Sequence, residues 1–216
     1  MEITRYSLPP TRLIPNSPLP LMHYRFENAL GPKVFQQLCD SNDWTVQWIY
    51  RYGDTQRSHY HSGAHECMAV LSGTATIRFG VGDTSLDMQD NTYGPAREAG
   101  GVEIEARAGD VFVLPAGTAH KTHKTNPKAE FRLMTPGDGH GIPEGTDLDK
   151  IELDGFTMVG AYPKGSKFWD SIKGDEQDGP AFANVWSMQR PAKDPVLGYS
   201  PQGLAGAWAT RLIPKL

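Results

Sequence analysis

The sequence is poor in cysteine, in long apolar runs and in net charge of either sign. Its 216 residues contain only two cysteines, Cys39 and Cys67, which cannot build a framework of disulfide bonds. No apolar run reaches the ~18 residues of a membrane-spanning helix. The formal net charge of −4 provides no basic field that would attract phosphates. These absences argue against a disulfide scaffold, a membrane protein and a nucleic-acid-binding protein.

The first residues also lack the pattern of a secretory signal, in which a positive region precedes about 7 to 15 apolar residues. We therefore expect a protein of a reducing, cytoplasmic compartment. With 38% hydrophobic residues, the chain is long enough for one well-buried core, and we expect a single domain.

Proline dominates the start of the chain. Residues 1–22 hold five prolines, which fix φ and remove backbone donors, so this segment is predicted to be an extended arm. A short helix is predicted next, because Pro32 suits a first helical position. The apolar residues that follow have the spacing of one helix face: Val34, Phe35, Leu38 and Cys39.

From residue 44 onward the apolar pattern changes to a period of two. Short strand-like runs follow one another, and glycines separate most of them, which is typical of an antiparallel sandwich or barrel. Two long polar connections, residues 83–100 and 135–154, interrupt the pattern and are predicted to cover the mouth of a site. In the first run the alternation predicts one shared, core-facing side for Trp44, Val46, Trp48, Tyr50 and Tyr52.

The stretch HYHSGAHE carries the densest group of possible metal ligands. His59 and His61 are two residues apart, so an extended strand would point both imidazoles to one side. Glu66 could add a carboxylate to the same face, and His120 could supply a further imidazole from a distant strand. An isolated His-x-His pair is more often a simple surface or hydrogen-bonded pair, but the combination of the four residues favours a metal site.

Two spaced motifs carry a resemblance to a known family. The first places Gly53, His59, His61, Glu66 and Gly73 at the spacing of the first cupin motif. The second follows the other cupin motif through the residues Gly109, Pro115, Gly117 and His120, and departs from it where Lys124 replaces a common asparagine. The chain resembles the cupin superfamily, and in particular its small single-domain YjlB-like group, from about residue 44 to 208.

The resemblance implies an all-β fold, the cupin double-stranded β-helix or jelly-roll barrel. The proline-rich arm and the short helix would occupy residues 1–43, the barrel residues 44–163, and a C-terminal extension that packs on the barrel residues 164–216. The resemblance also implies one divalent transition metal, with iron or manganese favoured over nickel, copper or zinc. Its ligands would be His59, His61, Glu66 and His120.

Such an open site predicts catalysis on a small molecule. Our leading hypothesis is a dioxygenase-type oxidoreductase acting on a phenolic, enol or polyketide-like metabolite, with Glu66 as a ligand that also takes a proton. A redox-neutral isomerase or cyclase and a non-catalytic metal- or ligand-binding barrel remain alternatives. A homodimer is also possible for this fold. We expect no nucleic-acid or membrane partner.

The other titratable residues are predicted to serve structure. His65 is expected to form structural hydrogen bonds, and Cys67 is expected to pack in the core because it alternates with Glu66. His123 is expected on an outer loop, whereas His23 and His140, in Pro- and Gly-rich segments, are expected to be exposed to solvent.

Overall fold

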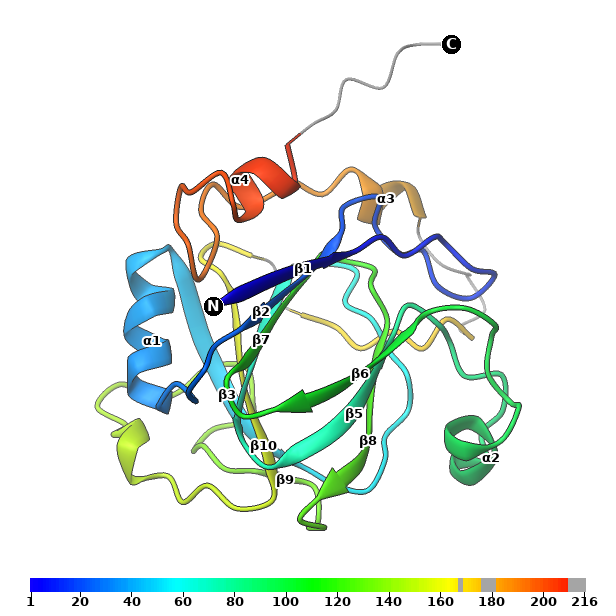
Figure 1. The fold of residues 1–216 in the computed structure, drawn as a ribbon, viewed down its shortest axis with the longest axis horizontal. Helices are drawn as coiled ribbons and strands as arrows, with labels where there is room; N and C mark the ends of the chain where they lie inside the picture. The colour runs from blue at the N-terminus through cyan, green and yellow to red at the C-terminus, as the bar shows by residue number, and fades with distance from the viewer. Residues whose placement is uncertain (167–168, 176–181, 210–216) are drawn as a thin grey trace.

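The chain folds into two antiparallel β-sheets that close on each other (Figure 1). The computed structural model describes residues 1–166, 169–175 and 182–209. The larger sheet has the strand order β1-β2-β7-β4-β10-β3-β9, and the smaller has the order β6-β5-β8. The predicted all-β jelly roll is therefore confirmed. The strands are β1 (Glu2–Tyr6), β2 (Leu21–Arg25), β3 (Trp44–Tyr52), β4 (Glu66–Ser72), β5 (Thr74–Phe79), β6 (Val102–Arg107), β7 (Asp110–Leu114), β8 (His120–Asn126), β9 (Arg132–Leu133) and β10 (Phe156–Pro163).

Helical segments are short and lie outside the barrel. They are α1 (Pro32–Ser41), α2 (Met88–Tyr93), the 3-10 helix η1 (Leu148–Lys150), α3 (Phe182–Trp186) and α4 (Leu204–Ala207). The helix predicted after Pro32 is present as α1, and Pro32 stands in its first turn. The polar connection 83–100 contains α2, which begins after Asp87, whose carboxylate accepts from the backbone N–H of Gln89 and Asp90.

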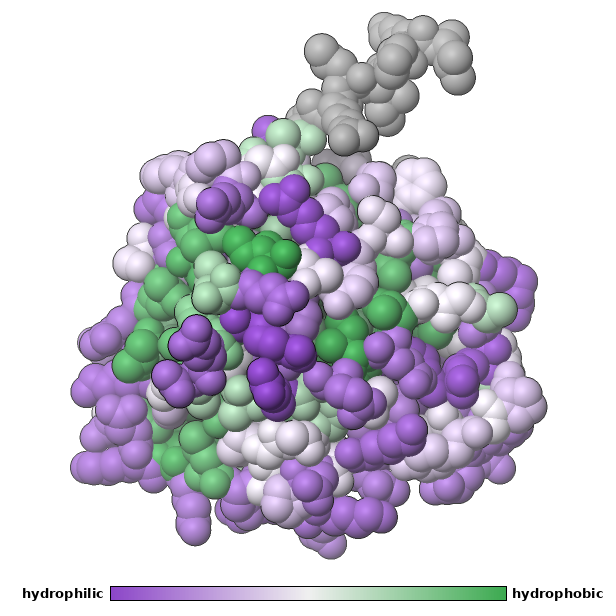
Figure 2. All heavy atoms as spheres, in the orientation of Figure 1, coloured by the Kyte–Doolittle hydropathy of each residue, from purple (hydrophilic) through white to green (hydrophobic). Residues whose placement is uncertain are grey.

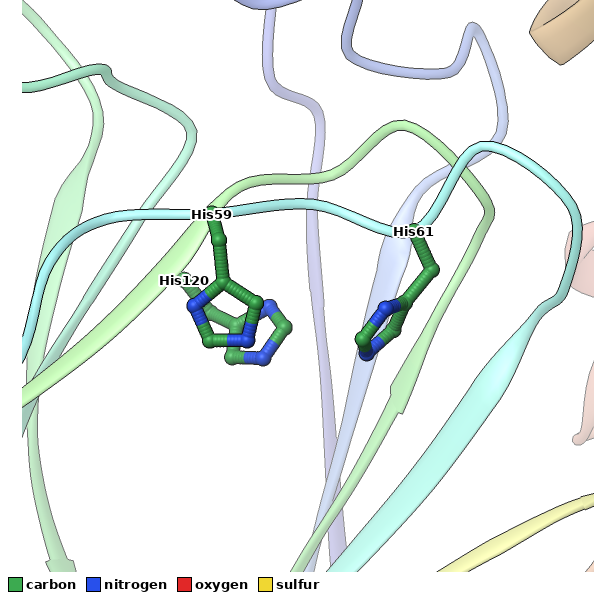
Figure 3. Close-up of side chains that lie close together, drawn as sticks. All are labelled: His59, His61 and His120. Atoms are coloured by element: carbon green, nitrogen blue, oxygen red, sulfur yellow. The ribbon is translucent and has the colours of Figure 1, made fainter. Parts of the chain in front are cut away.

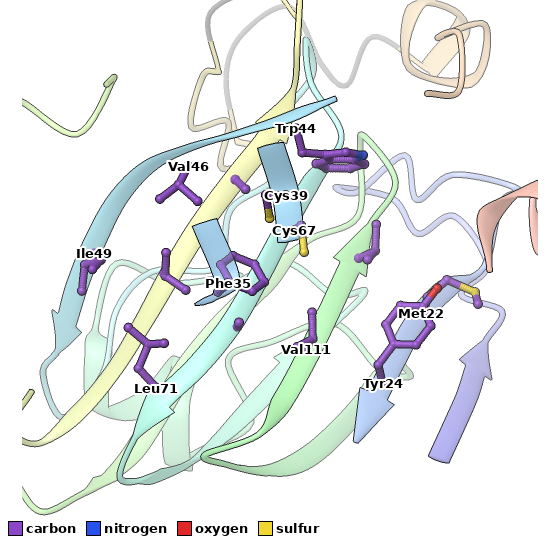
Figure 4. Packing of buried hydrophobic residues seen from close by; sticks show 14 of the residues in the cluster. Met22, Tyr24, Phe35, Cys39, Trp44, Val46, Ile49, Cys67, Leu71 and Val111 are labelled. Atoms are coloured by element: carbon purple, nitrogen blue, oxygen red, sulfur yellow. The ribbon is translucent and has the colours of Figure 1, made fainter. Parts of the chain in front are cut away.

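The larger sheet separates two apolar clusters. Along β4 the side chains alternate, so that Cys67, Ala69 and Leu71 face an outer cluster and Met68 and Val70 face the barrel interior. Helix α1 closes the outer cluster, as Figure 4 shows, with the fully buried Phe35 and Cys39. Cys67 packs in this core, as predicted. The interior cluster lies between the two sheets and continues to the floor of the candidate site.

Strand β3 does not keep one face, and this corrects the sequence prediction. Trp44 and Val46 lie in the outer cluster, whereas Trp48 and Tyr52 lie in the interior one. The cause is an irregularity in pairing with β10, where Gly160 pairs with Trp48 and the next residue pairs with Val46. One extra residue, Gln47, therefore interrupts the alternation and turns Trp48 toward the barrel.

The N-terminal residues join the larger sheet directly. β1 pairs with β2, and β2 pairs with β7, so the prolines of residues 9–20 lie in the connection between two strands. Leu21 and Met22, at the start of β2, are buried on opposite sides of the sheet. The division of the chain at residues 43 and 163 stays a prediction.

The apolar residues are concentrated inside the molecule. The face shown in Figure 2 is mostly hydrophilic, with hydrophobic side chains in separate patches, one of them below α4. Scattered apolar groups of this kind are usual on a protein surface. Within the described part of the chain, no helix has the length and apolar character needed to cross a membrane.

A buried carboxylate fixes the start of β7 to β2. Asp110 is fully buried, and its Oδ1 lies 2.9 Å from His23 Nε2 and accepts from Arg25 Nε at 2.7 Å. Its Oδ2 accepts from the backbone N–H of Arg107 at 2.8 Å. His23 was predicted to be exposed, and this is wrong: it is 5% exposed and stacks on Phe112 with ring centroids 4.5 Å apart.

We predict that Asp110→Asn lowers the free energy of unfolding by about 2 kcal/mol at pH 7. Burial opposes the charged form of Asp110, but the bonds from His23, Arg25 and Arg107 outweigh it and lower the pKa to about 2. The unfolded carboxyl titrates near ~3.9. The stabilisation is therefore complete above that value and is lost as the pH falls from about 4 toward 2.

Urea denaturation at pH 7 and at pH 3 measures this effect, with Asp40→Asn on the exposed face of α1 as the control. The difference between wild type and Asp110→Asn should shrink at the lower pH. A difference that is the same at both values would contradict the assignment.

Candidate metal centre

The two histidines of the HYH stretch are held in an extended segment between two neighbours. The backbone N–H of His59 donates to the carbonyl of His120 at 3.2 Å, and the N–H of His120 donates back at 2.8 Å. On the other side, Tyr60 exchanges two backbone hydrogen bonds with Ile172. This extended conformation points His59 and His61 the same way, and Figure 3 shows both rings beside His120.

The structure brings all four predicted ligand residues together. In the described part of the chain, the nitrogen ligand atoms of His59, His61 and His120 lie within 4.8 Å of one another, so this group could hold a metal ion. Glu66 borders two of them: its Oε1 lies 3.2 Å from His61 Nε2 and its Oε2 lies 3.5 Å from His120 Nε2. Metal binding by the four residues stays a prediction.

The inner ring nitrogens of the histidines face backbone carbonyls. His59 Nδ1 lies 3.2 Å from the carbonyl of Arg57, His61 Nδ1 contacts the carbonyl of Asp170, and His120 Nδ1 lies 3.5 Å from the carbonyl of Thr118. A carbonyl only accepts, so we assign the proton of each neutral ring to Nδ1. Each Nε2 then presents a lone pair, which is how metal-binding histidines are commonly oriented.

Glu66 is fixed by a chain of hydrogen bonds from the barrel interior. It is the first residue of β4 and only 1% exposed. Its Oε1 accepts from the Tyr162 hydroxyl at 2.6 Å, and the Tyr162 oxygen accepts from Trp48 Nε1 at 3.1 Å. Its Oε2 is buried and has no hydrogen-bond partner among the described residues.

The charges of the site are strongly coupled. Burial raises the pKa of Glu66, but His61, His120 and the Tyr162 hydroxyl outweigh it and lower the pKa to about 2. Burial lowers the pKa of His120 to about 4 despite Glu66, and burial with the neighbouring histidines lowers the pKa of His59 well below its usual value. For His61, Glu66 and the carbonyl of Asp170 outweigh burial and raise the pKa.

These facts fit a divalent transition metal. The neutral imidazoles of His59 and His120 and the ionised carboxylate of Glu66 are the protonation states that metal ligands require. The raised pKa of His61 comes from its contact with Glu66, and a metal would have to displace that proton. Four lone-pair donors pointing at one place repel one another unless a cation lies between them. The orphaned Oε2 of Glu66 is the buried atom that such a cation would satisfy. Three imidazoles and one carboxylate suit iron, manganese, nickel, copper or zinc.

The four residues line a cavity of about 440 Å³. Sequence analysis predicted core positions for Trp48, Tyr50 and Tyr52. Trp48 and Tyr52 belong to the interior cluster and Tyr50 packs against it, and all three side chains also line the cavity. Sequence reasoning missed Tyr162, Trp169 and Lys173, since they lie about 100 residues beyond the histidine cluster. The lining residues are Trp48, Tyr50, Tyr52, Gly53, Thr55, Gln56, Arg57, His59, His61, Glu66, His120, Thr122, Phe131, Tyr162, Trp169, Ser171 and Lys173.

The two polar connections do not line this cavity. Its outer wall comes from Phe131 and residues 169–173, which corrects the expectation that residues 83–100 and 135–154 cover the mouth. Residues 135–154 support the wall indirectly, because His140 stacks on Trp169 with ring centroids 4.1 Å apart. His140 is therefore half-buried, and the prediction that it is exposed to solvent is wrong. Residues 83–100 instead contact the far side of β8, where Asp83 pairs with the fully buried Lys121 at 3.1 Å.

The remaining histidines lie outside the site. His65 has the predicted structural role: its Nδ1 accepts from the N–H of Ala116 at 3.0 Å, and its Nε2 lies 3.1 Å from the carbonyl of Gln189. His123 was expected on an outer loop, which is wrong. It lies on β8 and is 1% exposed, on the opposite side of the strand from His120 because their positions differ by an odd number.

The fold and the site resemble those of the cupins: a jelly-roll barrel of two antiparallel sheets with three histidines and a glutamate gathered in its interior. The chain is a homologue of the Bacillus subtilis (strain 168) protein described as "Uncharacterized protein YjlB". The two are 26% identical over 202 residues, which is 91% of this chain and 92% of that protein. No protein-family model matches the chain.

Solved structures give weaker likenesses. Vicilin from Corylus avellana is 14% identical with a TM-score of 0.30, over 68% of this chain and 30% of vicilin. A point mutant of Bacillus subtilis oxalate decarboxylase is 14% identical with a TM-score of 0.32, over 80% of this chain and 36% of the decarboxylase. The dTDP-4-dehydrorhamnose 3,5-epimerase from Elizabethkingia anophelis NUHP1 is 14% identical with a TM-score of 0.32, over 86% of this chain and 91% of the epimerase. This chain thus spans about a third of the first two proteins, and these likenesses assign it neither substrate nor reaction.

Gly160 gives the Trp48 indole room to reach Tyr162. A Cβ built on Gly160 would lie 2.0 Å from Trp48 Cζ2. The indole therefore lies against the bare backbone of β10, where its Nε1 reaches the hydroxyl that holds Glu66.

We predict that Gly160→Ala lowers the free energy of unfolding by about 1–3 kcal/mol, because the methyl group forces the packed indole to move. Chemical denaturation followed by circular dichroism measures the loss, and a shift of tryptophan emission reports the displaced ring. Gly31→Ala is the matched control, since nothing lies within 4 Å of a Cβ at that position. Stability equal to wild type in Gly160→Ala would show that the indole is not confined there.

Proposed function

We propose that this protein is a metal-dependent oxidoreductase of the dioxygenase type that acts on a small planar organic molecule. The main support is the convergence of three imidazole nitrogens and one buried carboxylate in the lining of a cavity with aromatic walls. Four protein ligands leave an octahedral ion with open positions for substrate, and open positions are typical of catalytic rather than structural sites. The cavity volume also falls within the range of small-molecule sites.

His59, His61, Glu66 and His120 would hold the metal. A bound iron, manganese, nickel or copper ion would supply redox chemistry with dioxygen, whereas zinc would supply Lewis acidity alone. Around it, the aromatic walls exclude water and orient a planar substrate. Glu66 would bind the metal through Oε2, since that oxygen has no other partner among the described residues, while Tyr162 holds Oε1 in place.

The first test is elemental analysis of protein purified without chelator or a metal-affinity tag. We expect about one iron, manganese, nickel or copper ion per chain, lost in a His59→Ala, His120→Ala double variant and retained in His123→Gln. An oxygen electrode then measures oxygen uptake with enols, catechols and β-diketones. Uptake should require the metal and fail in the double variant.

Zinc as the sole metal, or substrate turnover that consumes no oxygen, would replace the oxidoreductase with an isomerase or cyclase. Protein that binds none of these ions even after reconstitution would overturn the catalytic proposal and leave a ligand-binding barrel.

We predict that Tyr162→Phe weakens metal affinity by about tenfold or more, because the variant loses the hydroxyl that fixes Glu66 and leaves Trp48 Nε1 without its acceptor. Competition for Mn²⁺ or Zn²⁺ against a chelating dye measures the affinity, and circular dichroism checks the fold. Tyr199→Phe, at a residue 70% exposed, is the matched control. Equal affinities of Tyr162→Phe and wild type would remove Tyr162 from the site.

A further inference from the structure

Thr122 carries a buried hydroxyl that points to a ligand. It follows His120 by two residues on β8, so both side chains project to the same side of the strand. Thr122 is 1% exposed and lines the cavity, yet its Oγ1 has no hydrogen-bond partner among the described residues. A buried hydroxyl of this kind is costly unless something bonds to it, and a molecule in the cavity can do so.

The charged side chains of the described lining give the cavity a positive character. Lys173 and Arg57 both line it, against the single carboxylate of Glu66, which faces the histidines. Asp175 neutralises Arg57 on its outer side, with a distance of 2.8 Å between Nη2 and Oδ2. Lys173 Nζ donates to the carbonyl of Ser171 at 3.1 Å, which keeps the ammonium beside the cavity wall. Any divalent ion at the histidines adds further positive charge.

The walls favour a flat molecule. Tyr50 and Phe131 stack with ring centroids 5.1 Å apart and an interplanar angle of 16°, and Tyr162 and Trp169 are nearly parallel at 7°. Phe131 is 58% exposed at the rim of the cavity although it is a large aromatic residue. Aromatic faces pack well against planar rings and conjugated systems.

We propose that the cavity selects small planar anions, such as aromatic or enolic carboxylates, whose charge is attracted by Lys173 and one of whose polar atoms bonds to Thr122 Oγ1. The inference rests on the proposed function in that it names the substrate class of the same site. The binding itself depends on side chains that are not metal ligands, so it can be measured with and without a metal.

The test compares benzoate with its uncharged isostere benzamide. Isothermal titration measures both affinities on chelator-treated and on Zn²⁺-loaded protein, with quenching of tryptophan emission as the second readout. We expect benzoate to bind at least about tenfold more tightly. On chelator-treated protein, Lys173→Met should abolish this preference, Lys173→Arg should restore it, and Lys150→Met, at an exposed lysine, should leave it unchanged.

The hydroxyl is tested separately with a variant of nearly the same shape. Thr122→Val should weaken benzoate binding by about tenfold, while Thr122→Ser should retain it because the hydroxyl remains. Equal binding of benzoate and benzamide by wild type, or full benzoate affinity in both Lys173→Met and Thr122→Val, would overturn the inference. If the protein binds no metal but keeps the preference on chelator-treated samples, the proposed function fails and the anion site stands.

Discussion

The buried carboxylate of Glu66 is the constraint around which the barrel interior is organised. A charge taken out of water is costly unless bonds and opposite charges compensate it. Here Tyr162 donates to Oε1, His61 Nε2 lies beside the same oxygen, and His120 Nε2 lies beside Oε2. The two strands that hold Glu66 and Tyr162, β4 and β10, are direct neighbours in the larger sheet. The carboxylate therefore stands on a stiff part of the fold, where its position is set by backbone pairing.

A local irregularity in another strand makes this arrangement possible. Trp48 reaches the barrel interior because β3 carries an extra residue where it pairs with β10, and its indole has room because Gly160 has no side chain. The same ring helps to line the cavity and donates to Tyr162. Bulges often re-aim a side chain beside an active site. In this protein the bulge links core packing to the orientation of a candidate ligand.

Much of the architecture and of the candidate site could be predicted from local sequence. The period of two, with glycines between short runs, predicted an antiparallel barrel, and Pro32 with its following apolar residues predicted α1. The two-residue spacing of His59 and His61 predicted a shared direction, because strand geometry alone decides which way alternate side chains point. Their convergence with Glu66 and His120 followed from the resemblance of the spacing to cupin motifs.

Other features depend on contacts that no local pattern contains. A bulge depends on the partner strand, so the alternation after Trp44 predicted the wrong face for Trp48, Tyr50 and Tyr52 and missed their role as cavity wall. His23 and His123 are polar by sequence but buried by the strands on which they lie. Tyr162, Trp169, Lys173 and Thr122 join the site through contacts between segments far apart in the chain. Local sequence is thus enough to specify the strands and the metal-ligand spacing. The surroundings of those ligands arise only in the packed fold, because long-range strand pairing sets which residues face one another.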